Sequence, residues 1–302
     1  MKSSVVSIVV VSWNSAAVLP GLLETLADGM AGTDWQFVLA DNASADDSVA
    51  VVRAALPDAR IVQTGRNAGY AAAINAAVAE VRPEGPVLVL NPDIRLRPGF
   101  GKALLAGLEA EPGTGIAAPR LLGADGSVTP TLRREPSLPR AVGEAVLGNI
   151  RAGRFPLLGE IVTDPDAYTR PTRADWSTGA ALLVSAECAA ACGPWDESFF
   201  LYSEETEYQL RARDRGFATR LVPGAVAVHL EGESEVSPRL WTLVVLNKVR
   251  LYRRRHGRMP SALFRLALLV REVSRGWLVG HERSRVAARA LVRPIGPVGG
   301  LG

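Results

Sequence analysis

Polar side chains follow four short apolar runs in the first third of the chain, and their types are those that bind small charged molecules. They are Ser12–Ser15, Asp41–Ser44, Gly65–Gly69 and Asn91–Asp93. Carboxylate oxygens are the ligands that hard divalent cations prefer, and amides and hydroxyls donate and accept hydrogen bonds. The same residues cap helices and form turns, so one such segment alone would mean little. Four in succession favour a ligand-binding site.

A second group of reactive side chains lies further along the chain. Glu204 and Glu205 begin a helical pattern, and His229 ends an apolar run. A carboxyl group between an acidic neighbour and an apolar stretch has a raised pKa, which suits a general base. A neutral imidazole binds Mn²⁺ or contacts a phosphate. The structural alternatives are two acids that stabilise a helix start and a histidine with no role in binding.

The first part of the chain alternates apolar runs with helical periodicity. Strands are predicted over 5–11, 36–40, 60–63, 86–90 and 116–118, and helices over 16–29, 46–56, 69–81 and 98–110. Short alternating elements of this kind form βαβ units, in which helices cover a parallel sheet. Ligands then bind beyond the carboxyl ends of the strands, where the four polar segments lie. We therefore predict an α/β fold.

Residues 119–175 break this alternation. They are rich in Pro and Arg and predict a long irregular segment, of the kind that often forms a functional loop or lid. Regular patterns return at Trp176, with helices predicted over 185–192 and 203–215 and strands over 217–222 and 225–230. From about Pro238 onward the pattern is helical and basic.

The C-terminal part of the chain carries most of the positive charge. Residues 239–302 hold 14 Lys and Arg against 2 Asp and Glu, a net charge of +12, whereas residues 1–238 hold 20 against 29, a net charge of −9. Apolar residues at helical spacing predict an amphipathic helix within 261–280: Leu263, Leu266, Leu269, Val273 and Trp277. This helix either packs on the rest of the protein or lies on an anionic membrane surface, and both alternatives stay open. No groove-binding motif or RNA signature occurs, so we expect no nucleic-acid partner.

Composition and missing motifs exclude several classes of protein. Hydrophobic residues make up 48% and charged residues 22% of the 302 residues, which excludes a disordered chain, a collagen-like repeat and a coiled coil. The first predicted strand is not followed by G-x-G-x-x-G, which argues against a dinucleotide-dependent oxidoreductase. G-x-x-x-x-G-K-[ST] is absent too, so a P-loop enzyme is not expected.

A set of motifs in the correct order resembles those of the family 2 glycosyltransferases with the GT-A fold. The motifs are Ser7–Asn14, Asp41–Ser44, Arg66–Tyr70, Asn91–Asp93, Trp176–Ala180, Trp195–Glu205 and His229–Ser234. Within that family the chain is most similar to bacterial rhamnosyltransferases that use dTDP-L-rhamnose, among them enzymes that add rhamnose to a polyprenyl-diphosphate-linked GlcNAc. The segments that carry this narrower resemblance are Ala118–Leu122, Asp125–Val128 and Pro136–Leu138.

The resemblance implies a division of the chain. A mixed, mainly parallel sheet flanked by helices is expected over residues 1–235, the GT-A catalytic domain. Its nucleotide-sugar-binding half is expected over 1–118 and its acceptor-binding half over 119–235. Residues 236–302 are expected to form a basic, amphipathic helical extension.

The resemblance also implies which side chains bind the donor. The residues expected to bind the nucleotide sugar are Ser12, Trp13, Asn14, Asp41, Arg66, Asn67, Asn91 and Asp93. Asp93 and His229 are expected to hold a divalent cation, Mg²⁺ or Mn²⁺, at the diphosphate. The chain departs from the family at Asn91, where many relatives carry another acid, so metal affinity without nucleotide should be weak.

On the acceptor side, the resemblance implies a binding surface and a catalytic base. Trp176, Gly179 and Glu204 are expected to bind the acceptor, and Glu205 is expected to deprotonate its hydroxyl in a single inverting displacement. The family usually has Asp at the position of Glu205. A Glu is longer by one methylene, which puts the geometry of the base in doubt.

The activity that follows is a metal-dependent, inverting transfer of L-rhamnose from dTDP-L-rhamnose to a glycan or a polyprenyl-diphosphate-linked saccharide, in cell-envelope polysaccharide synthesis. One alternative is a UDP-sugar transferase of the same fold, galactofuranosyl or hexosyl. Another is a non-catalytic nucleotide-sugar-binding protein with a degenerate site. The expected location is the cytoplasm, with peripheral attachment to the inner face of the cell membrane as an open alternative.

Overall fold

The apolar run near the N-terminus forms strand β1 (Val6–Ser12), in which every residue is buried. A strand at the centre of a sheet is covered on both faces, which explains this nearly continuous run. β1 pairs in parallel with β2 (Trp35–Asp41) on one side and with β4 (Val87–Leu90) on the other. β3 (Arg60–Gln63) extends the sheet beyond β2, again in parallel.

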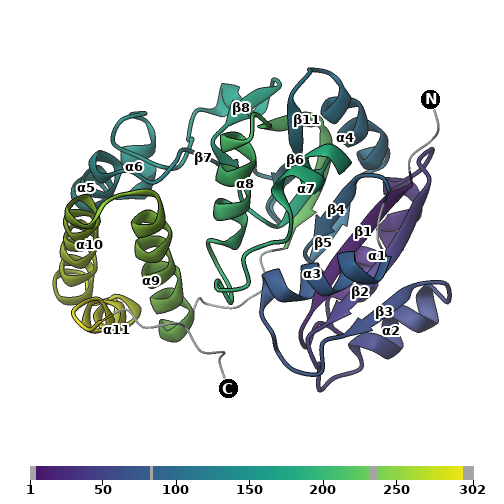
Figure 1. Cartoon of the computed structure of the whole chain (residues 1–302), viewed down its shortest axis with the longest axis horizontal. Helices are drawn as coiled ribbons and strands as arrows, with labels where there is room; N and C mark the ends of the chain where they lie inside the picture. Colours follow the sequence, from purple (N-terminus) through teal and green to yellow (C-terminus); the bar gives the residue numbers. More distant parts are fainter. Residues whose placement is uncertain (1–4, 82–83, 231–236, 295–302) are drawn as a thin grey trace.

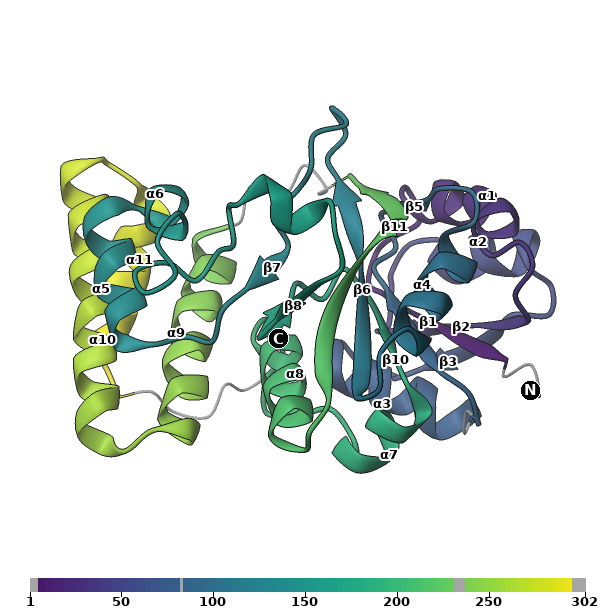
Figure 2. The ribbon, with the colours of Figure 1, turned by 90° about the horizontal axis from the view of Figure 1, so that it is seen from above.

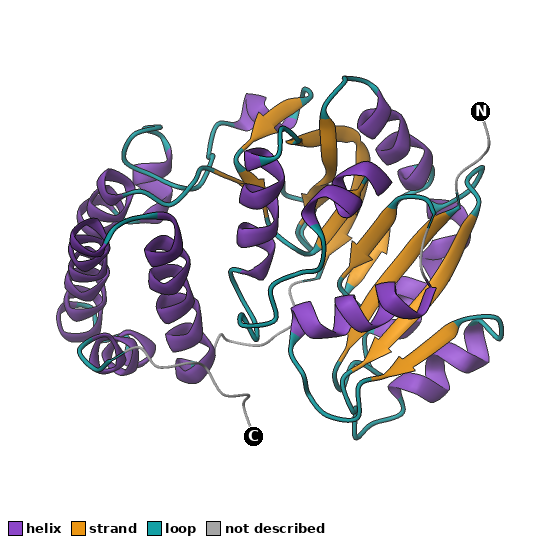
Figure 3. Ribbon diagram, viewed as in Figure 1, coloured by secondary structure: helices purple, strands orange, loops and turns teal. Residues whose placement is uncertain are grey.

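The computed structural model describes residues 5–81, 84–230 and 237–294. Within these ranges nine strands form the main sheet, in the order β3-β2-β1-β4-β10-β6-β11-β5, with β8 paired to β11. Helices cover both faces of this sheet, and a second group of helices lies at one end of the molecule (Figures 1 and 3). The predicted α/β fold with a mixed, mainly parallel sheet is therefore confirmed.

Two apolar cores lie on the two faces of the sheet. One core is shared with α1 (Leu19–Gly29), α2 (Ser48–Ala55) and α4 (Phe100–Glu109). The other core is shared with α3 (Tyr70–Val81), α7 (Ala186–Cys192) and α8 (Glu204–Asp214). The helices predicted for these segments are confirmed, and each starts or ends within a few residues of the predicted limit.

The second half of the sheet is mixed. β10 (Ala181–Val184) is antiparallel to both of its neighbours, β4 and β6 (Thr114–Leu122). β11 (Ala218–His229) runs parallel to β6 and antiparallel to the short strand β5 (Ile94–Leu96). We predicted two strands where β11 is one, and that prediction is wrong. The register shifts between Val222 and Val226 because Pro223 lacks an N–H group, so the strand bulges rather than ends.

The prediction of an irregular segment over 119–175 is also wrong in part. The segment contains two helices, α5 (Leu138–Leu147) and α6 (Asn149–Gly153), a 3-10 helix over Pro165–Tyr168, and the strands β7 (Leu132–Arg133) and β8 (Thr172–Ala174). The side chain of Ser137 caps α5 by accepting a hydrogen bond from the Arg140 N–H at 3.4 Å. Pro139 lies in the first turn, where a missing N–H costs nothing. The prolines therefore start a helix here.

The C-terminal helices confirm the expected helical extension. They are α9 (Pro238–Arg255), α10 (Arg258–Val273), a π-helical turn over Ser274–Leu278, and α11 (Glu282–Leu291). They share an apolar core with α5, so part of the 119–175 segment joins this group (Figure 2). Within the described part of the chain, none of the helices combines the length and apolar character needed to cross a bilayer.

Candidate active site

The loops that follow β1 and β2 are joined by side chains of the predicted site. The Asn14 N–H donates to Ser44 Oγ at 2.9 Å, and Asn14 Oδ1 accepts from the Ala45 N–H at 2.8 Å. Asn14 adopts a left-handed φ of 54°, a conformation that Asn tolerates better than most residues. Ser12 ends β1 opposite Asp41, and its buried hydroxyl has no hydrogen-bond partner among the described residues.

Asp41 is buried, and its carboxylate is used by the turn that follows. Oδ1 accepts from Ser44 Oγ at 2.6 Å, and Oδ2 accepts from the Ser44 N–H at 3.1 Å. The structure therefore shows the turn-capping role of this residue. Trp13 lies next to the loop, and 57% of its surface is exposed. An aromatic ring exposed to this extent beside polar strand ends is free to pack on a ligand.

The loop after β3 contacts the segment that precedes α8. Arg66 is exposed, and Asn67 Oδ1 accepts from the Gly69 N–H at 3.3 Å. The Tyr70 N–H donates to the Phe200 carbonyl at 2.8 Å. Gly69 has a φ of +93°, and a Cβ there would lie 2.3 Å from the Phe200 carbonyl oxygen. Glycine is required at this contact both by backbone conformation and by space.

Tyr70 lies at the centre of the site, and sequence analysis gave it no role. Its hydroxyl donates to Asn91 Oδ1 at 2.9 Å and lies 3.4 Å from the Gly179 carbonyl oxygen. Burial raises its pKa, and the charges of Glu204, Glu205 and Asp93 raise it further. The hydroxyl therefore stays protonated and joins the end of β4 to the segment that contains Gly179. The only signal in the sequence was its place at the end of the Arg66–Tyr70 motif.

Asp93 and His229, which were expected to bind a metal, lie side by side. Asp93 Oδ2 is 3.3 Å from His229 Nε2, because β5 and β11 pair with Ile94 opposite His229. A carboxylate oxygen and an imidazole nitrogen together fit Mn²⁺ or Mg²⁺. Among the described residues, no three His, Cys, Asp or Glu side chains form a group that could hold a metal. A cation at this pair would therefore need further ligands from a bound substrate or from water. Residues 231–234, the rest of the motif that begins at His229, lie outside the described residues.

Glu204 and Glu205 begin α8 directly after an unusual turn. Tyr202 and Ser203 have left-handed φ values of 66° and 76°, which cost energy in residues with a side chain. The turn is held from α9 by Asn247, which is fully buried. Its Nδ2 donates to the carbonyls of Leu201 at 2.9 Å and Tyr202 at 3.1 Å. Sequence analysis missed Asn247, whose role depends on a contact distant in sequence.

One oxygen of each carboxyl group is shielded from water. In each, Oε2 is buried and has no hydrogen-bond partner among the described residues. Burial raises the pKa of Glu204 well above its ordinary value, and the charge of Glu205 adds to this effect. Burial also raises the pKa of Glu205, although backbone N–H groups and Arg133 oppose the shift. A carboxylate with a raised pKa accepts protons more readily, as a general base requires.

A cavity of about 230 Å³ opens beside Glu205. Arg133, Trp176 and Tyr202 line it on one side, and Lys248 and Arg271 line it from the C-terminal helices. Trp176 is largely buried, and its indole Nε1 donates to the Arg134 carbonyl at 3.2 Å. Glu204 is buried and does not line this cavity, whereas Gly179 contacts Glu205. Arg133 and Lys248 were not among the predicted site residues, although Arg133 lies in the segment predicted to bind the acceptor.

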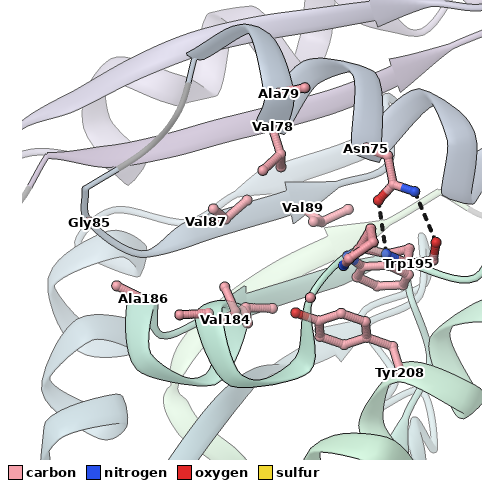
Figure 4. Close-up of a pocket in the computed structure, with 14 residues that line it drawn as sticks. Asn75, Val78, Ala79, Gly85, Val87, Val89, Val184, Ala186, Trp195 and Tyr208 are labelled. Atoms are coloured by element: carbon pink, nitrogen blue, oxygen red, sulfur yellow. Dashed lines mark hydrogen bonds between the residues drawn. The ribbon is translucent and has the colours of Figure 1, made fainter.

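A larger cavity of about 520 Å³ lies between α3, α7 and β4. Figure 4 shows Asn75 at one end, where it accepts from the Trp195 N–H at 2.8 Å and donates to the Trp195 carbonyl at 2.9 Å. The remaining lining residues are mostly apolar, and none carries a carboxyl group. This cavity therefore lacks the groups needed for proton transfer or metal binding.

The family of the chain follows from a comparison of sequences. The family described as glycosyl transferase family 2 matches residues 7–159. That range is half of the chain and contains all four polar strand ends. The chain belongs to glycosyl transferase family 2. The predicted family is thus confirmed.

Two curated relatives of this glycosyltransferase are named as rhamnosyltransferases. The chain is similar to the N-acetylglucosaminyl-diphospho-decaprenol L-rhamnosyltransferase of Mycobacterium tuberculosis, in strains H37Rv and CDC 1551 / Oshkosh. The two sequences are 30% identical over 207 residues, which cover 65% of this chain and 67% of the relative.

Solved structures confirm the GT-A fold of the glycosyltransferase. GalNAc-T7 with UDP, GalNAc and Mn²⁺ superposes with a TM-score of 0.59 at 15% identity, over 83% of this chain and 48% of that one. The chain thus spans about half the length of GalNAc-T7. The mannosyltransferase PcManGT from Pyrobaculum calidifontis, in complex with GDP-Man and Mn²⁺, superposes with a TM-score of 0.56 at 14% identity. The superposition covers 96% of this chain and 75% of PcManGT. TarS of S. aureus in complex with UDP superposes with a TM-score of 0.54 at 14% identity, over 93% of this chain and 73% of TarS.

Proposed function

We propose that this glycosyltransferase moves L-rhamnose from dTDP-L-rhamnose to a glycan or a polyprenyl-diphosphate-linked saccharide in cell-envelope polysaccharide synthesis. The observation that carries the proposal is the convergence of Glu205 and the Asp93–His229 pair around Tyr70. The mycobacterial relative supports the choice of sugar and acceptor, because its name specifies rhamnose transfer to a lipid-linked N-acetylglucosamine.

The donor half, residues 1–118 in this proposal, binds the nucleotide sugar at its strand ends. Asp41 and Trp13 would contact the base, and Asn14, Arg66 and Asn67 lie in the loops around it. Asp93 and His229 would hold Mg²⁺ or Mn²⁺ at the diphosphate. Such a cation, when bound, neutralises charge that develops on the leaving nucleoside diphosphate. Asn91, fixed by the Tyr70 hydroxyl, lies beside this pair and adds no charge to it.

The acceptor half, residues 119–235, supplies the base. Glu205 would take the proton from an acceptor hydroxyl, whose oxygen bonds to the anomeric carbon as the bond to the diphosphate breaks. A base opposite the leaving group gives inversion in one displacement. The cavity lined by Trp176 and Arg133 would hold the acceptor sugar, with Gly179 at its edge and Glu204 shaping it from behind.

The lipid-linked acceptor places the protein at a membrane in this proposal. We propose a cytoplasmic protein attached peripherally to the inner face of the cell membrane through residues 236–302. The net charge of +12 over residues 239–302 supports attraction to anionic lipids.

Calorimetric titration of dTDP-L-rhamnose, UDP-galactofuranose, UDP-glucose and UDP-GlcNAc, each with and without Mg²⁺ or Mn²⁺, tests the donor. We expect metal-dependent binding of dTDP-L-rhamnose at least tenfold tighter than of the UDP sugars, and loss of the metal dependence in Asp93→Asn. Preference for a UDP sugar would replace the donor assignment and keep the mechanism. Donor binding without turnover on any lipid-linked saccharide would favour the non-catalytic alternative, for which Asn91 and Glu205 are the motivating departures.

A further inference from the structure

Helix α10 is apolar on two opposite faces. Phe264 and Leu268 point into the core that α10 shares with α5 and α9. The other face carries large apolar side chains that are between 43% and 77% exposed: Met259, Leu263, Leu266, Val270 and Val273. Their spacing of three or four residues places them in one stripe. The structure therefore confirms that the helix packs on the rest of the protein with one face, and it leaves an apolar stripe exposed on the other.

The stripe is continued by a segment distant in sequence. α5 packs directly against α10, as Figures 1 and 2 show. Val142 and Val146 on α5 are exposed, as are Ile150 on α6 and Phe155 and Leu157 after it. Directly after α10, Trp277, Leu278 and Val279 are exposed as well. We call these exposed apolar residues, with the α10 stripe, the α5–α10 face. Soluble monomers rarely expose so many neighbouring apolar residues.

The acidic residues near this face are mostly buried in ion pairs, whereas several arginines beside it are exposed. The acidic residues Glu144, Glu160 and Glu272 are buried and pair with Lys248 and Arg271. Arg151, Arg154 and Arg258, which are next in sequence to apolar residues of the face, are exposed. This part of the protein thus keeps these three carboxylates internal and presents arginines to the solvent.

We infer that the α5–α10 face docks on an anionic phospholipid bilayer. Apolar side chains next to arginines are the pattern of helices that lie in the membrane interface, with their apolar face about 5–10 Å deep. Two copies paired through this face would instead bring two strongly basic regions together. The face is also wider than one helix, which fits a planar bilayer better than a coiled-coil seam.

The inference deepens the proposed function. Docking itself is argued from the exposed residues alone, and only the purpose of docking rests on the proposed function. Arg271 lies on α10 away from the exposed stripe and lines the cavity beside Glu205. The thickness of α10, about 10–12 Å with side chains, therefore separates the bilayer surface from the cavity wall. The saccharide of a lipid-linked acceptor would therefore reach Glu205 while its polyprenyl chain stays in the bilayer.

Sedimentation of the full chain with vesicles tests the inference. We expect at least tenfold more binding to vesicles of phosphatidylcholine with phosphatidylglycerol than to phosphatidylcholine alone, and less binding as NaCl rises. The double variant Leu266→Glu/Val270→Glu should lower binding at least tenfold. Val128→Glu is the matched control, because Val128 is 43% exposed on the sheet domain and its change should leave binding intact.

Three outcomes would overturn the inference. They are absence of vesicle binding by the unaltered chain, unchanged binding by the double variant, and a dimer in light scattering that the double variant dissociates. Circular dichroism and donor titration show whether the double variant folds, and its transfer to a short-chain, water-soluble acceptor should be unchanged. Vesicle binding without any sugar transfer would overturn the proposed function and leave the docking face in place.

Discussion

Gly179 lies directly against the side chain of Glu205. A Cβ at position 179 would come within 3.2 Å of Glu205 Cβ and 3.3 Å of its Cγ. The Gly179 carbonyl lies 3.4 Å from the Tyr70 hydroxyl. The glycine therefore lies between the proposed base and Tyr70, the residue that binds Asn91, and it fits there because it has no side chain.

Replacement of Gly179 tests whether its close contact with Glu205 matters for catalysis. Gly179→Ala should push Glu205 by a few tenths of an ångström and lower kcat by about tenfold, because small displacements of a catalytic group are costly. Donor binding measured by calorimetry should stay within twofold. Gly224→Ala is the control, since its Cβ would meet only Ala103 Cβ at an ordinary 3.9 Å. Equal kcat values for the two variants would contradict the prediction.

The charge state of Glu205 predicts how the rate depends on pH. Its pKa is raised by burial, so kcat/KM should increase with pH until the carboxyl is deprotonated, with a midpoint above that of an ordinary glutamate. Glu205→Gln should lower kcat by about 10²–10⁴-fold, the usual contribution of a general base. A pH–rate series on both forms measures this effect. Near-normal turnover by Glu205→Gln would remove Glu205 as the base.

Asn247 is expected to act as a positioning residue. Asn247→Leu leaves the Leu201 and Tyr202 carbonyls without their donor, so the left-handed turn before Glu205 should relax. We expect kcat to fall at least tenfold with unchanged donor affinity, and the free energy of unfolding to fall by about 1–3 kcal/mol. The acid limb of the pH–rate profile should shift as well, which a purely structural loss would not produce. Arg253→Ala, on the exposed side of the same helix, should leave both the rate and the profile unchanged.

The buried ionic cluster predicts a pH-dependent stability. Burial lowers the pKa of Lys248, but Glu144 and Glu160 more than offset this, so its net shift is upward. Lys248→Met leaves the two carboxylates short of a cation and should lower the free energy of unfolding by about 3–5 kcal/mol at neutral pH.

The carboxyl pKa values in Lys248→Met would then lie above those of the unfolded chain. The folded variant then binds protons more tightly than the unfolded chain does. The free energy of unfolding lost in Lys248→Met should therefore shrink as pH falls and grow as pH rises. Urea unfolding of both forms at about pH 5 and pH 8 measures this difference. An equal loss at both values would show that missing packing, rather than charge, is responsible.

The first half of the fold was predictable because its strands are nearly continuous apolar runs. Val6–Ser12 and Val87–Leu90 are buried on both faces, which leaves a clear signal in the sequence. β10 was missed because an apolar stretch of four residues does not distinguish a strand from part of a helix. α5 was missed because prolines were interpreted as breaks rather than as helix starts.

The candidate site also contains residues that were predictable from the sequence and residues that were not. The strand-end residues were predictable, because parallel strands deliver their carboxyl ends to one edge, and family motifs pointed to Glu205 and His229. Tyr70, Asn247 and Arg133 were not predictable. Their importance comes from contacts between distant segments, such as Tyr70 with Gly179 and Asn247 with Tyr202. No local pattern marks such contacts.

The position of β10 has a consequence for how the chain folds during synthesis. Val184 pairs with Val87, so β4 stays an open sheet edge until the ribosome has made almost two thirds of the protein. Pairings this distant fold slowly, and intermediates with open edges aggregate readily. A ribosome-bound chain that ends near residue 120 should therefore need chaperone protection, and the supply of chaperones should limit the yield of expression.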